Sequence, residues 1–281
     1  MRVTLLGASG LLGQDLVQEL KADQLTALSS KDADLRDHAR IREVIRDSRP
    51  DWILLSAAYT DVDGCELNRD LAFAVNFEGA VNVAECAREA GSRLMFLSSD
   101  YVFDGTKESP YQTNDARKPI NVYGESKARA EERLLEILPE VCIVRTSWLF
   151  GLGGKCFPAT ILKLASTRPG ISVVNDQRGS PTFARDLAAA LVQLCRASAR
   201  GIVHVTNAGD CTWYEFATEI VRESGLPTTV KPVTTAEFPR PARRPAYSVL
   251  SPDSLHAYNV HMPEWRDGLR RYLGSAAALK L

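Results

Sequence analysis

Tyr123 and Lys127 lie four residues apart in the segment NVYGESK, residues 121–127. In a helix this spacing places both side chains on one face, with a rise of about 6 Å between them. A phenol beside an ammonium group can act as a proton donor, because the positive charge stabilises the phenolate that is left behind. Taken alone, the spacing is more typical of an aromatic side chain beside a solvated charge, because helices contain many i, i+4 pairs. The pair therefore needs support from the rest of the chain.

A pair of hydroxyl side chains ends the apolar run RLMFLS, residues 93–98. We interpret this run as a buried strand, so that Ser98 and Ser99 come at its carboxyl end. In an open parallel sheet, ligands bind at the carboxyl ends of the strands. These two serines are therefore candidates for contact with a ligand.

A glycine-rich turn, GASGLLG, follows the expected first strand, residues 2–6, and precedes an expected helix, residues 11–20. The glycines allow a tight turn, a close approach of the backbone to a pyrophosphate, and close packing of the helix on the strand. The helix N-terminus then offers N–H groups and a partial positive charge to phosphates. This context predicts a dinucleotide site with the cofactor-binding residues Gly7, Ser9, Gly10, Leu11, Leu12 and Gly13.

The end of the second expected strand bears on the choice of cofactor. It reads LSSKDADL, residues 28–35, with Ser30 and Lys31 where an acidic residue would favour NADH. Hydroxyl and ammonium groups can donate hydrogen bonds to a phosphate, so we expect NADPH as the cofactor, with NADH possible. Asp34 and Leu35 are placed to meet the adenine, although Asp34 is also suited to cap the next turn.

The first half of the chain alternates apolar runs with amphipathic segments. Strands are expected at residues 2–6, 25–28, 52–57, 93–98 and 141–146, and helices at 11–20, 38–47, 70–90 and 123–138. This alternation predicts an α/β fold, a Rossmann doubly wound parallel sheet with a smaller C-terminal substrate-binding lobe. We expect residues 1–150 to form the NAD(P)-binding domain. Residues 151–281 would be mainly the lobe, with some segments returning to the sheet, helices at 157–167, 185–198 and 213–224, and an ordered proline- and arginine-rich loop at 238–252.

Composition limits the classes of partner and of site. The 281 residues carry 34 basic and 35 acidic side chains, a net charge of −1, so no attraction to nucleic acid or to a membrane surface is expected. The six cysteines form no C-x-x-C motif and no metal-ligand cluster with the four histidines. We therefore expect a reduced, cytoplasmic protein and no metal site.

Ser99, Tyr123 and Lys127 together resemble the catalytic triad of the short-chain dehydrogenases/reductases. The resemblance implies that Ser99 orients a substrate carbonyl, that Tyr123 protonates it during reduction, and that Lys127 supports the tyrosine and the nicotinamide ribose. A phenol with an ordinary pKa of about 10 would need that pKa to fall by roughly 3 units to exchange protons near neutral pH. We expect Lys127 to supply part of this fall.

Longer blocks resemble one family within that group, the dTDP-4-dehydrorhamnose reductases. They run in order over nearly the whole chain and include SSDYVFDGTKESPYQ, RTSWLFG, VVNDQRGSPTFARDLA and FPRPARRPAYSVL. The resemblance implies NAD(P)H-dependent reduction of the C4 keto group of dTDP-4-dehydro-L-rhamnose to dTDP-L-rhamnose. Further site residues follow from it. Ala57, Ala58 and Tyr59 would pass along the cofactor, and Ser98, Asp100, Tyr101, Trp148 and Arg244 would bind the substrate.

Two departures from the family pattern fall in regions that we expect to recognise substrate. Cys156 stands where asparagine is usual, and Tyr247 stands where the pattern RPxNS has its asparagine. Two alternatives stay open beside the family's reaction. One is a reductase or epimerase of another nucleotide sugar, and the other is a catalytically quiet NADP-binding regulatory subunit. The chain offers no helix face apolar enough to identify an interface, and a homodimer is possible.

Overall fold

The computed structural model describes residues 1–275. Its centre is a six-stranded sheet in the order β2-β1-β3-β4-β5-β10, with every neighbouring pair parallel. The strands are β1 (Arg2–Leu6), β2 (Gln24–Leu28), β3 (Trp52–Leu55), β4 (Arg93–Ser99), β5 (Cys142–Thr146) and β10 (Gly201–His204). The chain runs outward from β1 to β2 and then crosses to β3 on the other side of β1. This reversal creates a topological switch point at the carboxyl ends of β1 and β3, where such sheets bind ligands.

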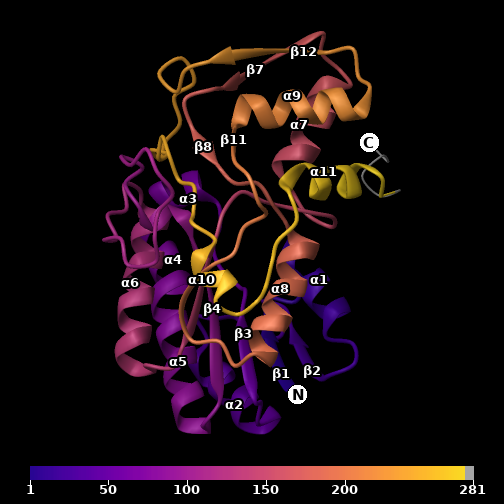
Figure 1. Ribbon diagram of the computed structural model, residues 1–281. Coiled ribbons are helices and arrows are strands. Elements are labelled where there is room, and N and C mark those ends of the chain that lie inside the picture. Colours follow the sequence, from indigo (N-terminus) through magenta and orange to yellow (C-terminus); the bar gives the residue numbers. More distant parts are fainter. Residues whose placement is uncertain (276–281) are drawn as a thin grey trace.

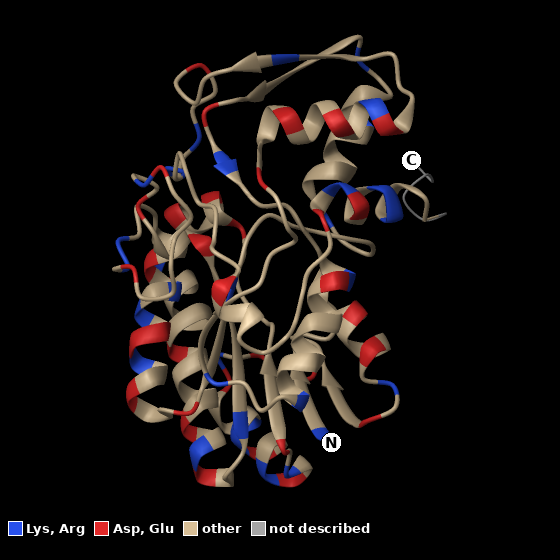
Figure 2. Ribbon diagram, viewed as in Figure 1, with Lys and Arg blue, Asp and Glu red and all other residues tan. Residues whose placement is uncertain are grey.

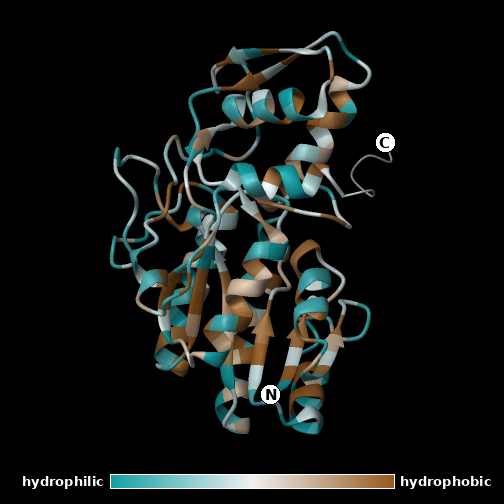
Figure 3. Ribbon diagram, turned by 45° about the vertical axis from the view of Figure 1, so that its right-hand side comes forward, coloured by the Kyte–Doolittle hydropathy of each residue, from teal (hydrophilic) through white to brown (hydrophobic). Residues whose placement is uncertain are grey.

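Helices cover both faces of the sheet (Figure 1). On one face lie α1 (Leu11–Glu19) and α8 (Ala184–Arg196), and on the other lie α2 (His38–Ser48), α5 (Gly79–Ala90) and α6 (Val122–Ile137). Because both faces are covered, strands such as β3 are buried at every position, which accounts for apolar runs without polar alternation. Figure 3 shows these apolar strands between helices whose outer sides are hydrophilic. The predicted Rossmann fold is confirmed.

The helix expected at residues 70–90 is interrupted. The structure has α3 (Val62–Leu67), α4 (Arg69–Phe73), a π-helical turn η1 (Ala74–Glu78) and then α5. Asn76, within η1, is buried and accepts a hydrogen bond from the Tyr59 backbone N–H at 2.8 Å, while its own amide donates to the Tyr59 carbonyl at 3.0 Å. The wider turn thus coincides with a side chain that ties the helix to the segment after β3, a contact that local periodicity does not encode.

A smaller lobe lies above the carboxyl edge of the sheet (Figure 1). It contains α7 (Phe157–Ala165), α9 (Trp213–Ser224) and α11 (Trp265–Leu273), around a core that includes Phe150, Phe183 and Phe216. Its strands form three two-stranded pairs, β6 (Leu149–Phe150) with β9 (Thr182–Phe183), β7 (Gly170–Val174) with β12 (Thr229–Val233), and β8 (Arg178–Gly179) with β11 (Cys211–Thr212). The second half of the chain also supplies β10 and α8 to the central sheet, so the two parts interleave in sequence.

The arginine- and proline-rich segment before α10 (Asp253–His256) forms no helix or long strand, but it is held at several points. Asn121 donates to the Arg243 carbonyl at 2.8 Å, and Arg178 exchanges backbone hydrogen bonds with Ala246 and Ser248. This segment therefore bridges the lobe and the start of α6.

Charged side chains of both signs are interspersed over the outer helices (Figure 2). This pattern agrees with the near-zero net charge. Among residues 1–275, no helix is both long enough and apolar enough to cross a membrane.

Candidate active site

A cleft of 530 Å³ opens above the carboxyl ends of the central strands and below the lobe. It contains the glycine turn, the ends of β3, β4 and β5, and the first turns of α6. Most of the residues expected at the site line it. These are Gly7, Ser9, Gly10, Leu11, Leu12, Gly13, Ser30, Ala57, Ala58, Ser98, Ser99, Asp100, Tyr101, Tyr123, Lys127 and Trp148.

The glycine turn has the shape that a pyrophosphate requires. Gly7 has a φ of 103°, which side chains rarely allow, and a Cβ there would lie 2.6 Å from the Ala57 nitrogen. A Cβ on Gly13 would lie 2.1 Å from the Gly7 carbonyl oxygen, so α1 packs on the turn only with glycine at this position. Gly10 caps α1 without a side-chain hydrogen bond, which leaves this helix N-terminus to a ligand in the cleft.

The end of β2 presents a hydroxyl rather than a carboxylate. Asp32 accepts hydrogen bonds from the Ser29 backbone and hydroxyl at 2.9 and 2.6 Å, so its carboxylate closes a local turn. Ser30 lines the cleft, and Lys31 is exposed beside it. Asp32, the nearest acidic residue, is therefore engaged with Ser29 and does not replace an acidic residue at the ribose. This favours a cofactor whose adenosine ribose carries a phosphate.

Asp34 and Leu35 lie outside the cleft lining. The Asp34 carboxylate pairs with Arg36, with the closer contact at 2.6 Å. Leu35 is buried, and a Cβ added to Gly79 would lie 2.7 Å from the Cβ of Leu35. Asp34 and Leu35 thus shape this turn through local contacts, and their contact with adenine stays a prediction.

The three residues of the expected triad meet in the cleft. Asn121 caps α6 by accepting the Gly124 N–H at 2.7 Å, which starts the helix at Val122 and puts Tyr123 in its first turn. Lys127, one turn on, is 2% exposed and donates from Nζ to the Leu97 carbonyl at 2.8 Å. The helix thus presents the phenol and the ammonium to the strand that ends in Ser99.

Electrostatics at the triad differ from the expectation. Burial, together with the nearby Asp100 carboxyl, raises the pKa of Tyr123 above its ordinary value, and burial lowers the pKa of Lys127 to about 7. The expected fall in the pKa of Tyr123 is therefore wrong for the protein alone. A raised pKa keeps the proton on the phenol, which is the form that a reductase needs before the carbonyl oxygen becomes basic.

Asp100 and Thr146 add unmatched polar atoms to the cleft wall. Asp100 Oδ1 accepts the Ser99 hydroxyl at 2.9 Å, while Oδ2 is buried without a hydrogen-bond partner. Burial raises the pKa of Asp100 to about 7. The Thr146 hydroxyl is likewise buried and unpartnered. Buried polar atoms are costly when unpaired, so these two atoms lower the stability of the folded protein at the edge of the cleft.

Trp148 is held in a strained position by the lobe. Its φ is 46°, a region that bulky residues rarely occupy. One face of its ring stacks on Trp213 with centroids 3.5 Å apart, and a Cβ on Gly179 would lie 2.6 Å from its Cε2 atom. Trp148 is thus a fixed wall of the cleft, and the face that contacts Trp213 is not open to a sugar.

Two expected site residues make other contacts. Tyr59 meets Asn76 through its backbone and does not line the cleft. Arg244 pairs with Asp63, also outside the lining. Burial alone would raise the pKa of Asp63, but hydrogen bonds from Arg244 and Arg240 lower it to about 2. Arg244 therefore anchors its loop to α3, and its contact with a diphosphate stays a prediction.

The two departures from the family pattern also lie away from the cleft lining. Cys156 points into the lobe core, with its sulfur 3.6 Å from the Gly151 carbonyl and 3.7 Å from the Tyr272 hydroxyl. Tyr247 packs against the cluster that contains Phe103. Neither residue faces the site, so neither argues for a different substrate through direct contact.

Several residues that line the cleft are not among those expected from the sequence. Ser56, Thr146 and Ser147 follow strand ends, and the rule that singled out Ser99 could have found them. Lys155 and Trp213 come from the lobe. Lys155 adjoins Cys156, in a region expected to recognise substrate, whereas no motif around Trp213 indicates a site. They reach the cleft only because the lobe folds back over the sheet.

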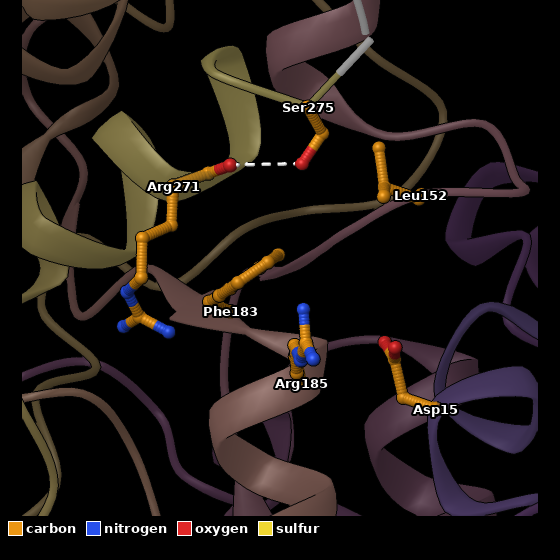
Figure 4. A pocket seen from close by; sticks show the side chains of 6 residues that line it. All are labelled: Asp15, Leu152, Phe183, Arg185, Arg271 and Ser275. Carbon is orange, nitrogen blue, oxygen red and sulfur yellow. Dashed lines mark hydrogen bonds between the residues drawn. The ribbon is translucent and has the colours of Figure 1, made fainter. Parts of the chain in front are cut away.

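A second, smaller cavity of 260 Å³ lies between α1, α8 and α11 (Figure 4). Asp15 and Arg185 face it, and Arg271 at its edge binds both carboxylate oxygens of Asp186 at 2.7 Å. None of the expected site residues lines it. Within residues 1–275, no group of three or more histidine, cysteine, aspartate or glutamate side chains is arranged to hold a metal ion.

The chain is similar to known proteins over nearly its whole length. The family model described as RmlD substrate binding domain matches residues 1–277. The spore coat polysaccharide biosynthesis protein SpsK of Bacillus subtilis is 41% identical over 274 residues, 97% of this chain and 96% of that protein. The dTDP-4-dehydrorhamnose reductase of Mycobacterium tuberculosis is 38% identical over 286 residues, 98% of this chain and 93% of that protein.

Among solved structures, the dTDP-4-dehydrorhamnose reductase of Bacillus anthracis in complex with NADP has a TM-score of 0.94 and 39% identity. The match covers 97% of this chain and 98% of that one. The folds therefore agree from the glycine turn to the lobe. This chain belongs to the RmlD substrate binding domain family.

Proposed function

We propose that this protein is a dTDP-4-dehydrorhamnose reductase, which uses NADPH to reduce the C4 keto group of dTDP-4-dehydro-L-rhamnose to dTDP-L-rhamnose. The observation that carries the proposal is the meeting of Ser99, Tyr123 and Lys127 with a glycine cradle in one cleft. Membership of the family and the likeness to a reductase bound to NADP support it.

The cradle and the end of β2 would hold the cofactor. The backbone at Gly7 and Gly10, with the N-terminus of α1, suits the pyrophosphate, and Ser30 suits the phosphate on the adenosine ribose. When bound, NADPH supplies the hydride that the reduction requires. Lys127, at the floor of the cleft, is placed to bind the hydroxyls of the other ribose.

Around the carbonyl, each side chain has a separate task. With its proton turned away from Asp100 Oδ1, the Ser99 hydroxyl would donate a hydrogen bond to the carbonyl oxygen and orient it. During the reduction the carbonyl oxygen would gain negative charge and take the proton of Tyr123. The Lys127 ammonium then stabilises the phenolate that remains. Asp100 and Thr146, which line the cleft, would lie beside the sugar, and Trp148 would limit where the ring can lie.

Absorbance at 340 nm tests this proposal. Purified protein would be mixed with NADPH or NADH and the 4-keto nucleotide sugar, made in situ, with a reaction that lacks the sugar as control. We expect oxidation that depends on the sugar and is faster with NADPH. Turnover only with a different nucleotide sugar would favour the first alternative. Tight cofactor binding without turnover of any such sugar would favour a regulatory subunit and overturn the proposal.

A further inference from the structure

A buried carboxylate lies directly behind the catalytic helix face. Glu131 follows Lys127 by one helical turn on α6 and is fully buried. Its Oε1 accepts the Ser98 hydroxyl and Arg145 Nε, the latter at 2.9 Å, and its Oε2 accepts Arg145 Nη2 and Arg117 Nε, each at 2.6 Å. One carboxylate thus joins α6 to β4, to β5 and to the loop before α6.

We propose that Glu131 is a positioning residue of the active site, which sets the spacing between the strand of Ser99 and the helix of Tyr123 and places a negative charge one helical turn from Lys127. It lies behind the cleft and is not among the residues that line it, so it acts through Lys127 and Ser98. The part of this proposal that concerns turnover rests on the proposed function.

The positional part follows from two neighbouring ties. Lys127 Nζ binds the Leu97 carbonyl, and Glu131 binds the Ser98 hydroxyl, so two successive residues of β4 are fixed to two successive turns of α6. Ser99 is the next residue on that strand, and Tyr123 is one turn earlier on that helix. Because catalytic groups lose rate steeply when misplaced by about 1 Å, both ties bear on the Ser99–Tyr123 geometry.

The electrostatic part follows from the charges that surround Lys127. Burial lowers its pKa to about 7, and the negative charge of Glu131 opposes that fall. The Cys65 thiol, from α3, is neutral near pH 7, because burial raises its pKa to about 11. Tyr123, on the same helix, keeps its proton, because burial raises its pKa.

The other titratable groups nearby do not supply Lys127 with a negative charge, so Glu131 is the anion that acts on it. Asp100, from η2 (Asp100–Val102), acts on Tyr123, whose pKa it raises. His204, from β10, is neutral because burial and Arg145 lower its pKa to about 3. Burial alone would raise the pKa of Glu131, but hydrogen bonds from Arg145 and Arg117 lower it, so the carboxylate is charged at neutral pH. Without it, Arg145 and Arg117 would lose the carboxylate that both bind, and Lys127 would lose its nearby negative charge.

The decisive variant is Glu131→Gln, which keeps the shape and removes the charge. We expect kcat to fall about 10- to 100-fold at pH 8 and much less at pH 6, because the alkaline limb of the kcat profile moves down by about one to two pH units. The KM for NADPH should change less than kcat. Glu131→Asp should restore part of the rate, with the limb near its original position.

Glu136→Gln is the matched control. It removes a carboxylate from the same helix, where Glu136 pairs on the surface with Arg133 and its side chain is 65% exposed. We expect neither kcat nor the pH profile to move. A fall in kcat of equal size at every pH in Glu131→Gln would show a structural role alone and overturn the electrostatic part.

Removing Glu131 leaves Arg145 buried and unpaired, which commonly destabilises a protein severely. If Glu131→Gln does not fold, the double variant Glu131→Gln/Arg145→Gln removes both charges of the pair and gives the same test. A readout without turnover is the pKa of Lys127 from lysine labelled with carbon-13 at Cε. We expect that pKa to fall by about one to two units in Glu131→Gln, and by less in the double variant, because there a positive charge is removed with the negative one. No fall would overturn the electrostatic part, even if the wild-type protein reduced no sugar and the proposed function failed.

Discussion

Two regions of this molecule are equally shielded from water and are built in opposite ways. Behind the cleft, the interior contains Lys127, Glu131 and Arg145, which are 2%, 0% and 0% exposed. In the lobe, the interior is a cluster of aromatic and aliphatic side chains around Phe216, which is also 0% exposed. Burial of charge is unfavourable unless hydrogen bonds and counter-charges balance it, whereas burial of aromatic rings is favourable. The first region therefore gives up stability to hold chemical groups, and the second supplies stability.

The lobe interior achieves this by ring geometry and by a well-ended helix. Phe150 meets the Phe216 and Tyr272 rings at 60° and 85°, arrangements that aromatic pairs prefer. Helix α9, which carries Phe216, begins with a capping box between Thr212 and Glu215. A rigid lobe keeps Trp213 against Trp148, and so fixes the wall of the cleft that faces the sheet.

The largest expected effect is that of Tyr123→Phe on turnover. The variant should lose about 10²- to 10⁴-fold in kcat, because the proton donor is removed, while NADPH binding stays nearly unchanged. Steady-state kinetics and a fluorescence titration with NADPH would measure the two quantities. Near-normal turnover would remove Tyr123 from the mechanism.

In the lobe, Phe216→Ala should lower the free energy of unfolding by about 3–5 kcal/mol, because it leaves a cavity among packed rings. Denaturant unfolding would measure the loss. At temperatures where the variant is folded, kcat should fall far less than in Tyr123→Phe. A loss below 1 kcal/mol would mean that the lobe interior is less tightly packed than its ring contacts indicate.

Behind the cleft, Lys127→Met should raise the free energy of unfolding, whereas Phe216→Ala lowers it. Because the folded-state pKa of about 7 lies below the ordinary value of 10.5, the unfolded chain binds more protons between these two pH values. Lys127 therefore destabilises the folded wild-type protein most below pH 7, and this destabilisation shrinks as pH rises toward 10.5. We expect the variant to be inactive but more stable by about 1–3 kcal/mol at pH 6, with the difference shrinking toward pH 10. Thermal unfolding at pH 6, 8 and 10 would measure it, and a less stable variant at pH 6 would contradict this view of the region.

The smallest expected effect concerns cofactor choice at the end of β2. Ser30→Asp should reduce the preference for NADPH over NADH by about 10- to 30-fold, since a carboxylate repels the ribose phosphate and binds free ribose hydroxyls. Comparison of kcat/KM for the two cofactors would test it, with Lys31→Gln as a milder change at the same turn. An unchanged ratio would place the phosphate elsewhere.

Sequence patterns predicted much of the sheet domain because its signals are local. The apolar runs around β1, β3 and β4, and the glycines at 7, 10 and 13, report their structure within a few residues. In the lobe, periodicity predicted helices α7 and α9 but not the strands, because β6, β8, β9 and β11 are two residues long and take their partners from distant segments. It also missed the π-helical turn, because Asn76 meets Tyr59 across 17 residues.

At the site, residue type and spacing singled out Ser99, Tyr123 and Lys127, and the fold class and family predicted from the chain are confirmed. Protonation could not be read in this way. The pKa of Tyr123 rises because burial and the Asp100 carboxyl act on it, and both depend on what lies around the ring. Trp213 and Lys155 enter the cleft only through the return of the lobe.

The sequence by itself thus determined which chemical groups are available and the order of elements that carries them, since strand and helix periodicity and turn glycines act over short distances. Only the tertiary structure decided how those groups are charged and which face of each is open. Glu131 illustrates the reason. From the sequence alone, it cannot be distinguished from the other charged residues of α6. Its role arises when strands β4 and β5 bring Ser98 and Arg145 to one carboxylate in a place without water.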